Sequence, residues 1–196
     1  MVEKTTDIFN MIITYHREKL INAMIYFARN TLYCGKTKLL KLLYFLDFKH
    51  FKETGKSVTG QDYYAWDMGP VPKAVFEEIS SAMRPDMQAA IHPLPAGEEF
   101  QKILPRQAFD GRYFSKREMR LLEDIAYIFR DAKADEMVES THFENEPWDR
   151  TTREKGRLQK IDYLLAIDSS IDSLPIEEVV ERMKERDEIR EIFGET

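Results

Sequence analysis

The chain has 196 residues, of which 43% are hydrophobic and 33% are charged, and its formal net charge is −6. This length suits one compact domain with short extensions, and the negative charge argues against a general nucleic-acid-binding protein, which needs a clustered positive surface. The single cysteine, Cys34, excludes an internal disulfide and a zinc site built from several thiolates.

No segment predicts export or membrane insertion. The first ten residues include acidic side chains and lack the apolar core of a signal peptide. The most apolar run, Leu39 to Phe48, is interrupted by Lys41 and Asp47 and is too short to span a membrane. We therefore expect a cytoplasmic protein in a reducing compartment, with no membrane partner.

Hydrophobic spacing predicts two helices near the start of the chain. After a short amphipathic segment capped by Thr6-Asp7, a helix is expected from Glu18 to about Thr31. The next helix, from Lys36 to about Thr54, has the most regular apolar stripe, and Gly55 is suited to end it. The residues expected to be buried are Leu39, Leu42, Leu43, Leu46 and Phe48 or Phe51. Six lysines lie between positions 36 and 56, which predicts a basic exposed side.

Residues 58–72 depart from helical spacing. Aromatic and β-branched residues near Gly60 favour a short strand or an extended loop. The segment Gly69-Pro70-Val71-Pro72 cannot lie inside a helix or a central strand, because neither proline has an N–H. We predict a stiff connector here, followed by a helix through Val75 and Ile79. Two interpretations stay open, a hairpin that only packs or a rigid surface that presents aromatic residues to a partner.

The second half of the chain predicts a long surface excursion and further helices. Prolines and glycines are frequent from residue 84 to 111, where one small strand is expected at Phe100 to Leu104. Ser115 and Glu118 form a capping box that begins a helix reaching Phe129. A shorter helix is predicted from about Ala134 to Thr141, and Glu146-Pro147-Trp148 ends or redirects it.

The last forty or so residues predict a buried segment and an acidic helix. Residues 158–167 are expected to be buried, and Pro175 begins a final amphipathic helix. From Glu177 to Thr196 the chain carries eight acidic and four basic side chains. This helix could pair with the basic side of the Lys36–Thr54 helix, which could instead receive an acidic partner.

No catalytic or cofactor-binding motif occurs in the sequence. The glycine-rich patterns of phosphate-binding loops and the G-x-S-x-G pattern of a nucleophile elbow are both absent. Gly35-Lys36-Thr37 lacks the upstream glycine that a phosphate-binding loop needs. Glu139 and His142 lie three residues apart, but a di-iron bundle needs a second such pair and further glutamates. We expect His142 to bond a nearby carbonyl or carboxylate, and Cys34 to be a small buried side chain. Neither enzyme activity, a metal nor any other cofactor is expected.

Three sequence features point to a family. A helical K-L-L-Y-F-x-D at residues 41–47 is followed by T-G-x-x-Y-x-A-x-x-x-G-P-V-P at 59–72. A helix that begins F-S-x-x-E at 114–118 precedes T-H-x-x-x-x-P-W at 141–148. In order and spacing these features resemble the Panacea domain family, the SocA-like antitoxins once grouped as phage-associated GepA-like proteins. The resemblance covers roughly residues 18–167.

This resemblance implies an antitoxin. Such domains are encoded beside a toxin gene and neutralise its product by direct protein contact, and the paired toxins are diverse. Some members lie in prophages, and one branch resembles a proteolytic adaptor that delivers the toxin to a AAA+ protease. Two mechanisms therefore stay open, steric masking of the bound toxin and its delivery to a protease. A docked C-terminal tail would favour masking, and an unpacked tail would favour delivery. Nucleic acid is not an expected partner.

We expect one set of residues to bind the partner. The set is Tyr64, Trp66, Asp67, Gly69, Pro70, Val71, Pro72 and His142. The prolines leave the loop little backbone entropy to lose on binding, and aromatic residues on a rigid loop make good interface anchors. His142 is expected to lie beside the Gly69–Pro72 segment, so that both motifs form one surface, with Trp148 as a wedge in the core.

The predicted fold is mainly α, a single compact helical domain with a small β hairpin or short strands around residues 58–68 and 98–110. The expected division is an N-terminal segment at 1–17, the Panacea/SocA-like domain at 18–167, and an acidic C-terminal helix at 168–196. This last helix is expected to pack on the domain or to extend from it.

Overall fold

The computed structural model describes residues 2–96, 100–143 and 145–193, and within its terminal helices the side chains of residues 2–15, 189, 190, 192 and 193 are not described. The fold is mainly α-helical, as predicted, with two small antiparallel sheets of two strands each. In chain order the elements are α1 (Val2–Asn30), α2 (Lys36–Thr54), β1 (Tyr63–Trp66), β2 (Gly69–Pro72), α3 (Lys73–Ser80), α4 (Pro85–Ala90), β3 (Ile91–Pro95), β4 (Gln101–Pro105), η1 (Gly111–Tyr113), α5 (Lys116–Ile128), α6 (Ala134–Ser140), α7 (Pro147–Lys155), η2 (Tyr163–Ala166) and α8 (Ile176–Phe193).

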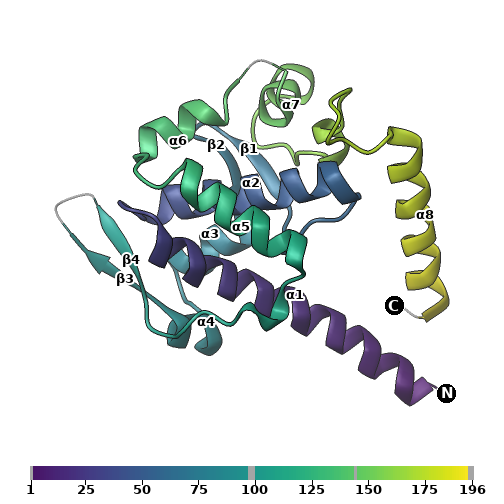
Figure 1. Ribbon diagram of the computed structural model, residues 1–196, viewed down its shortest axis with the longest axis horizontal. Coiled ribbons are helices and arrows are strands. Elements are labelled where there is room, and N and C mark those ends of the chain that lie inside the picture. The colour runs from purple at the N-terminus through teal and green to yellow at the C-terminus, as the bar shows by residue number, and fades with distance from the viewer. Residues whose placement is uncertain (1, 97–99, 144, 194–196) are drawn as a thin grey trace.

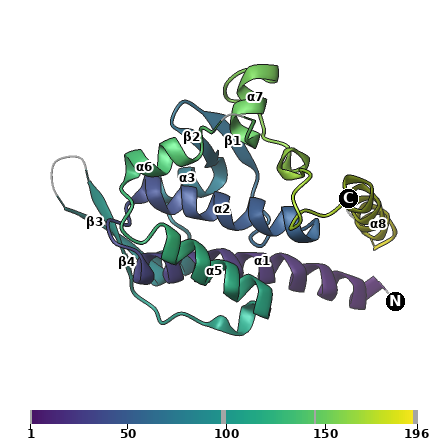
Figure 2. The same cartoon turned by 45° about the horizontal axis from the view of Figure 1, so that its top comes forward.

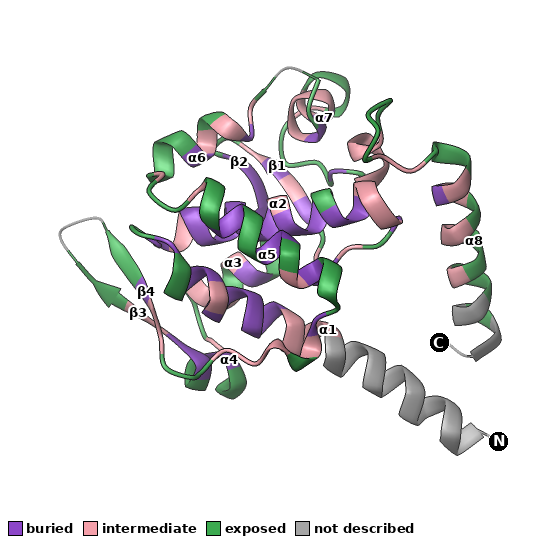
Figure 3. Ribbon diagram, viewed as in Figure 1, coloured by how far each residue is buried: buried purple, intermediate pink, exposed green. Residues whose placement is uncertain are grey.

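Helix α2 lies at the centre of the domain, with α1 and α5 beside it and the β1–β2 hairpin across it (Figure 1). Its predicted leucine stripe is buried, and so are both Phe48 and Phe51. Gly55 adopts φ +70° and donates its N–H to the Phe51 carbonyl, which ends the helix as predicted. Figure 3 shows buried residues concentrated along α2 and on the parts of α1 and α5 that face it.

The predicted basic side of α2 is wrong in part, because Lys38 and Lys41 are buried. The Nζ of Lys38 donates to three backbone carbonyls, those of Leu32, Arg130 and Ala132. These bonds tie the α1–α2 corner to the end of α5. Lys52 forms its ion pair with Asp168, at 2.7 Å, in the loop before α8 rather than with an acid of α8 itself.

The first helix is longer than the sequence predicted. α1 runs without a break from Val2 to Asn30, so the predicted helix start at Glu18 is wrong. The predicted cap at Thr6-Asp7 involves side chains outside the described ones. Residues 2–30 contain no glycine or proline, so nothing in the sequence interrupts the helix.

The Gly69–Pro72 segment is a strand, which corrects its prediction as a connector. β2 pairs antiparallel with β1, and Pro70 and Pro72 lie opposite Ala65 and Tyr63. On the side of β1 away from β2, the N–H and carbonyl of Ala65 and the carbonyl of Tyr63 form hydrogen bonds with residues 158–161. The two prolines therefore stand at positions of an edge strand where no N–H toward β1 is needed.

The predictions for the second half hold in part. The strand expected at Phe100 to Leu104 is β4, but it pairs with β3, which was not predicted, and α4 precedes that strand. The capping box of Ser115 and Glu118 is confirmed. Pro147 begins α7 instead of ending a helix, because proline suits a first helical turn. The buried segment expected at 158–167 is mostly wrong, since only Ile161 in it is buried.

Helix α8 docks on the end of α2 and otherwise stands apart from the other helices (Figures 1 and 2). Val179 is fully buried and lies against Gly55. Arg182 Nη1 and Arg186 Nη2 donate to the carbonyls of Thr54 and Gly55, at 3.1 and 2.6 Å. Guanidinium groups are favourable there, because the carbonyl end of a helix carries partial negative charge.

Candidate functional site

Asp47, the acidic residue of the first motif, connects α2 to the segment that leads into β1. The carboxylate is fully buried and accepts hydrogen bonds from the N–H groups of Val58 and Thr59, at 2.8 and 2.7 Å. It also accepts from the Thr59 hydroxyl and, at 2.7 Å, from the Tyr63 hydroxyl. Burial raises the pKa of Asp47 to about 6, although these bonds act to lower it.

Lys41, the basic residue of the same motif, connects α2 to β2. Its side chain is 1% exposed, and Nζ donates to the Pro70 carbonyl at 2.9 Å. Among the described residues, no carboxylate lies within ion-pair distance of this ammonium, and burial lowers its pKa to about 7. The lysine thus satisfies a carbonyl on the outer edge of the hairpin at a desolvation cost.

Gly69 is the point where the motif stretch at residues 59–72 meets the stretch at residues 141–148. It adopts φ +89°, and a Cβ placed on it would lie 2.5 Å from Thr141 Oγ1, 2.8 Å from Lys41 Nζ and 3.1 Å from His142 Nε2. The predicted proximity of His142 to the Gly69–Pro72 segment is therefore confirmed. Only a residue without a side chain fits here.

His142 and Trp148 complete this cluster. Their rings stack with centroids 3.8 Å apart, and Trp148 Nε1 donates to the Trp66 carbonyl at 2.9 Å. His142 Nε2 is buried and has no hydrogen-bond partner in the described part of the chain, so the predicted bond is not found at this atom. Burial and the nearby Lys41 lower the pKa of His142, which favours a neutral imidazole.

These contacts define the motif core, which consists of Lys41, Asp47, Tyr63, Gly69, His142 and Trp148. Residues that are more than a hundred positions apart in the sequence meet in it. Three of the motif stretches, those at residues 41–47, 59–72 and 141–148, supply partners for one another, so this part of the family pattern describes how α2, the hairpin and the α6–α7 segment are held together.

We expect the stability difference between wild type and Lys41→Met to depend on pH. The pKa of Lys41 is about 7 in the folded chain and about 10.5 when exposed. Between these values the unfolded chain binds the extra proton, so wild-type stability rises with pH, and methionine removes this term. The free energy of unfolding of Lys41→Met minus that of wild type should therefore be roughly 3 kcal/mol smaller at pH 9.5 than at pH 6.5, measured by urea unfolding. An equal difference at both pH values would show that Lys41 does not titrate in this range.

The structure gathers the eight predicted partner-binding residues around one hairpin, but leaves few of them accessible. Gly69, Pro70, Val71 and Pro72 are buried, and Tyr64, Trp66 and His142 are half-buried. Trp66 packs edge-on against Phe76, with ring centroids 4.9 Å apart. The open part is the turn, where Asp67 pairs with Arg157 at 2.7 Å and Met68 is 62% exposed. Most of the set serves packing, and its contact with a partner stays a prediction.

A hollow of about 700 Å³ adjoins the motif core along α2. Aromatic side chains form much of its wall, those of Tyr44, Phe45, Phe48, Phe129 and Phe143. The Phe143 ring, in the loop between α6 and α7, is 63% exposed. Thr141 lines the hollow as well, so this space reaches the edge of the motif core.

The sequence reasoning missed a second exposed surface, at the α1–α2 corner. Leu32 and Tyr33 project from the turn between these helices, and Tyr127 and Ile128 from the end of α5. A signal was present for Tyr127, which lies on the side of α5 opposite the stripe that buries Leu121, Leu122 and Ile125. In the described part of the chain, no helix combines the length and apolarity that a membrane span requires.

The family described as "Antitoxin SocA-like, Panacea domain" matches residues 39–149, which is more than half of the chain. The chain belongs to this family. No curated protein and no solved structure matches it. Membership supports an antitoxin role in general, and with it a toxin as the partner.

Proposed function

We propose that this protein is the antitoxin of a toxin–antitoxin system and neutralises a cognate toxin by binding it directly, without catalysing a reaction. The observation that carries the proposal is the family match over residues 39–149. That range contains the whole motif core, so the matched stretch is the part that folds around α2 and the hairpin.

The docked C-terminal helix supports masking over delivery to a protease. A delivery adaptor would profit from an engageable, unpacked segment, whereas α8 buries Val179 and uses Arg182 and Arg186 to bind the end of α2. In masking, the antitoxin stays bound and the toxin persists in an inactive complex.

The test is growth during expression of the adjacent reading frame, with and without this protein. We expect arrest when that frame is expressed alone, rescue on co-expression, and co-purification of the two chains. Toxin abundance, followed after translation is stopped, should be unchanged by the antitoxin if masking operates and should fall if the toxin is delivered to a protease. Absence of arrest, or arrest without rescue, would contradict the antitoxin proposal.

A further inference from the structure

Large apolar side chains are exposed at one corner of the molecule, those of Leu32, Tyr33 and Tyr127, and Ile128 follows Tyr127 in the sequence. Leu32 is 48% exposed, Tyr33 53%, Tyr127 83% and Ile128 67%. The Leu32 N–H donates to the Arg130 carbonyl at 2.8 Å, and Leu32 and Tyr127 line the same hollow of about 320 Å³. Scattered exposed apolar residues are ordinary, but a group of this kind marks interaction sites.

The backbone at Tyr33 is strained and held in place. Its φ is +51°, which is uncommon for a residue other than glycine. The neighbouring backbone is fixed, because Lys38 Nζ donates to the Leu32 carbonyl at 2.8 Å and the Gly35 N–H to the Tyr33 carbonyl at 2.8 Å. The result is a half-exposed ring on a rigid turn, and such preorganisation lowers the entropy cost of binding.

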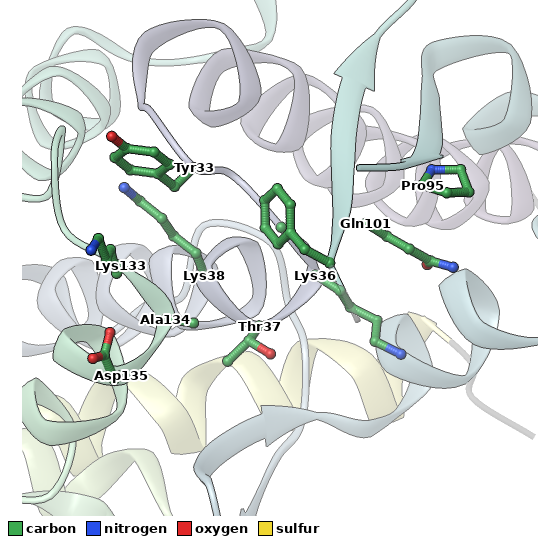
Figure 4. A pocket seen from close by; sticks show the side chains of 11 residues that line it. Tyr33, Lys36, Thr37, Lys38, Pro95, Gln101, Lys133, Ala134 and Asp135 are labelled. Atoms are coloured by element: carbon green, nitrogen blue, oxygen red, sulfur yellow. The ribbon is translucent and has the colours of Figure 1, made fainter. Parts of the chain in front are cut away.

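The surroundings of this ring are basic, although the chain as a whole is acidic. Of the charged side chains that the structure describes, Lys36, Lys38, Lys133 and Asp135 line a hollow of about 880 Å³ beside Tyr33. Figure 4 shows Tyr33, Lys38 and Lys133 on one side of it and Lys36 on the other. Asp131 and Glu136 also act on Lys38. Lys36 Nζ donates to Ser80 Oγ at 3.0 Å and lies 4.4 Å from the centre of the Phe76 ring, and neither Lys36 nor Lys133 forms an ion pair with a described residue.

Basic side chains also outnumber acidic ones in the lining of the hollow of about 320 Å³ beside Leu32 and Tyr127. Arg29 and Arg130 line it against Glu123. Since the formal charge of the whole chain is −6, this concentration of cations beside exposed apolar groups is complementary to an acidic partner.

A phosphate ligand at the start of α2 fits less well than a polypeptide. A Cβ placed on Gly35 would lie 2.6 Å from the Phe100 ring, so this ring covers the approach to the Gly35-Lys36-Thr37 turn. The exposed apolar groups also offer nothing that a phosphate could use.

We infer that this face docks a segment of the toxin that carries bulky apolar side chains next to carboxylates. We call it the Tyr33 surface and define it as Leu32, Tyr33, Lys36, Tyr127 and Lys133. The apolar groups receive the anchors, and the two lysines that lack ion pairs face the carboxylates. This inference rests on the proposed antitoxin function and places the toxin contact on a different face from the hairpin.

The decisive variant is Tyr33→Gly, because it removes the ring and relieves the positive φ at the same time. We expect the melting temperature not to fall, while the dissociation constant for the purified product of the adjacent reading frame rises about 30-fold, as for loss of an aromatic hot spot. A merely structural role of Tyr33 predicts unchanged binding. The charge variant Lys36→Glu/Lys133→Glu should weaken binding at least about tenfold and make the remaining affinity less dependent on salt.

Leu158→Gly is the matched control, since Leu158 has φ +63°, is 65% exposed and lies beside β1. Its binding should stay within about twofold of wild type, because it lies outside the proposed contact. Unchanged binding by Tyr33→Gly, or an equal or larger loss by Leu158→Gly, would overturn the inference. So would conversion of a wild-type dimer to a monomer by Tyr33→Gly, which would make a second copy the occupant.

The binding assay separates the two proposals. If the wild-type chain neither rescues growth nor binds the product of the adjacent frame, the proposed function fails and the inference fails with it. If the wild type rescues growth and Tyr33→Gly rescues and binds equally well, only the Tyr33 surface is wrong. The double change Lys116→Glu/Lys155→Glu, at exposed positions of α5 and α7 outside the Tyr33 surface, alters the net charge by the same amount and controls for the lysine variant.

Discussion

Replacing Gly69 with alanine is expected to lower the free energy of unfolding by roughly 2–5 kcal/mol. Two costs add at this position. A residue with a Cβ at φ +89° costs about 1–2 kcal/mol. The methyl group would also lie 2.5 Å from Thr141 Oγ1 and 2.8 Å from Lys41 Nζ, and crowding of this kind costs about 1–3 kcal/mol.

Gly156→Ala separates the two costs, because Gly156 has φ +88° and a Cβ there would meet no described atom within 4 Å. Its loss should be only the backbone term of about 1–2 kcal/mol. Urea unfolding of both variants, followed by circular dichroism, measures the difference. Equal losses would mean that the contacts of Gly69 with Thr141, Lys41 and His142 relax without cost, and that the motif core is looser than it appears in the structure.

Asp47→Ala is expected to lower the free energy of unfolding by roughly 3–5 kcal/mol, the range for breaking a buried polar network. The change leaves the N–H groups of Val58 and Thr59 and the hydroxyl of Tyr63 inside the protein without their acceptor. A buried donor without a partner costs about 1–3 kcal/mol, so several together outweigh the relief from removing a buried charge.

Asp168→Ala is the control for this variant, because Asp168 is an exposed carboxylate that pairs with Lys52 at 2.7 Å. Exposed ion pairs contribute little, so its loss should stay below about 1 kcal/mol. Thermal and urea unfolding compare the two. If Asp47→Ala were no more destabilised than Asp168→Ala, water would have to replace the lost acceptor, and Asp47 would not be what holds residues 58–63 on α2.

Together, the variants distinguish residues that build the domain from residues that touch the toxin. Changes in the motif core, such as Gly69→Ala, should weaken neutralisation only to the extent that they unfold the protein. Tyr33→Gly should weaken it in a protein that stays folded. With this separation the buried motifs can remain unchanged while an exposed surface varies.

Local rules allowed much of the helical framework to be predicted. The start and end of α2 follow from its apolar stripe and from Gly55, and the start of α5 follows from the capping box of Ser115 and Glu118. These signals act over a few residues, which is why the sequence alone contains them. The motif stretches also predicted the family and the proximity of His142 to Gly69.

Tertiary contacts decided the features that local rules could not. Lys38 and Lys41 were expected on an exposed side, but the carbonyls that receive them come from other parts of the chain. Likewise β2 is a strand because it pairs with β1. At Ala65 and Tyr63, opposite the two prolines, the hydrogen bonds of β1 are directed to residues 158–161 instead. A pattern of residue types does not specify which distant backbone group will be adjacent.

The sequence by itself therefore determined the fold class, the main helices and the family of this protein. Only the tertiary structure decided which polar residues are buried, and that the predicted partner-binding hairpin is largely enclosed while Tyr33 is exposed. The physical reason is that helix formation and capping depend on neighbours a few positions away, whereas burial depends on which surfaces meet after the chain has folded.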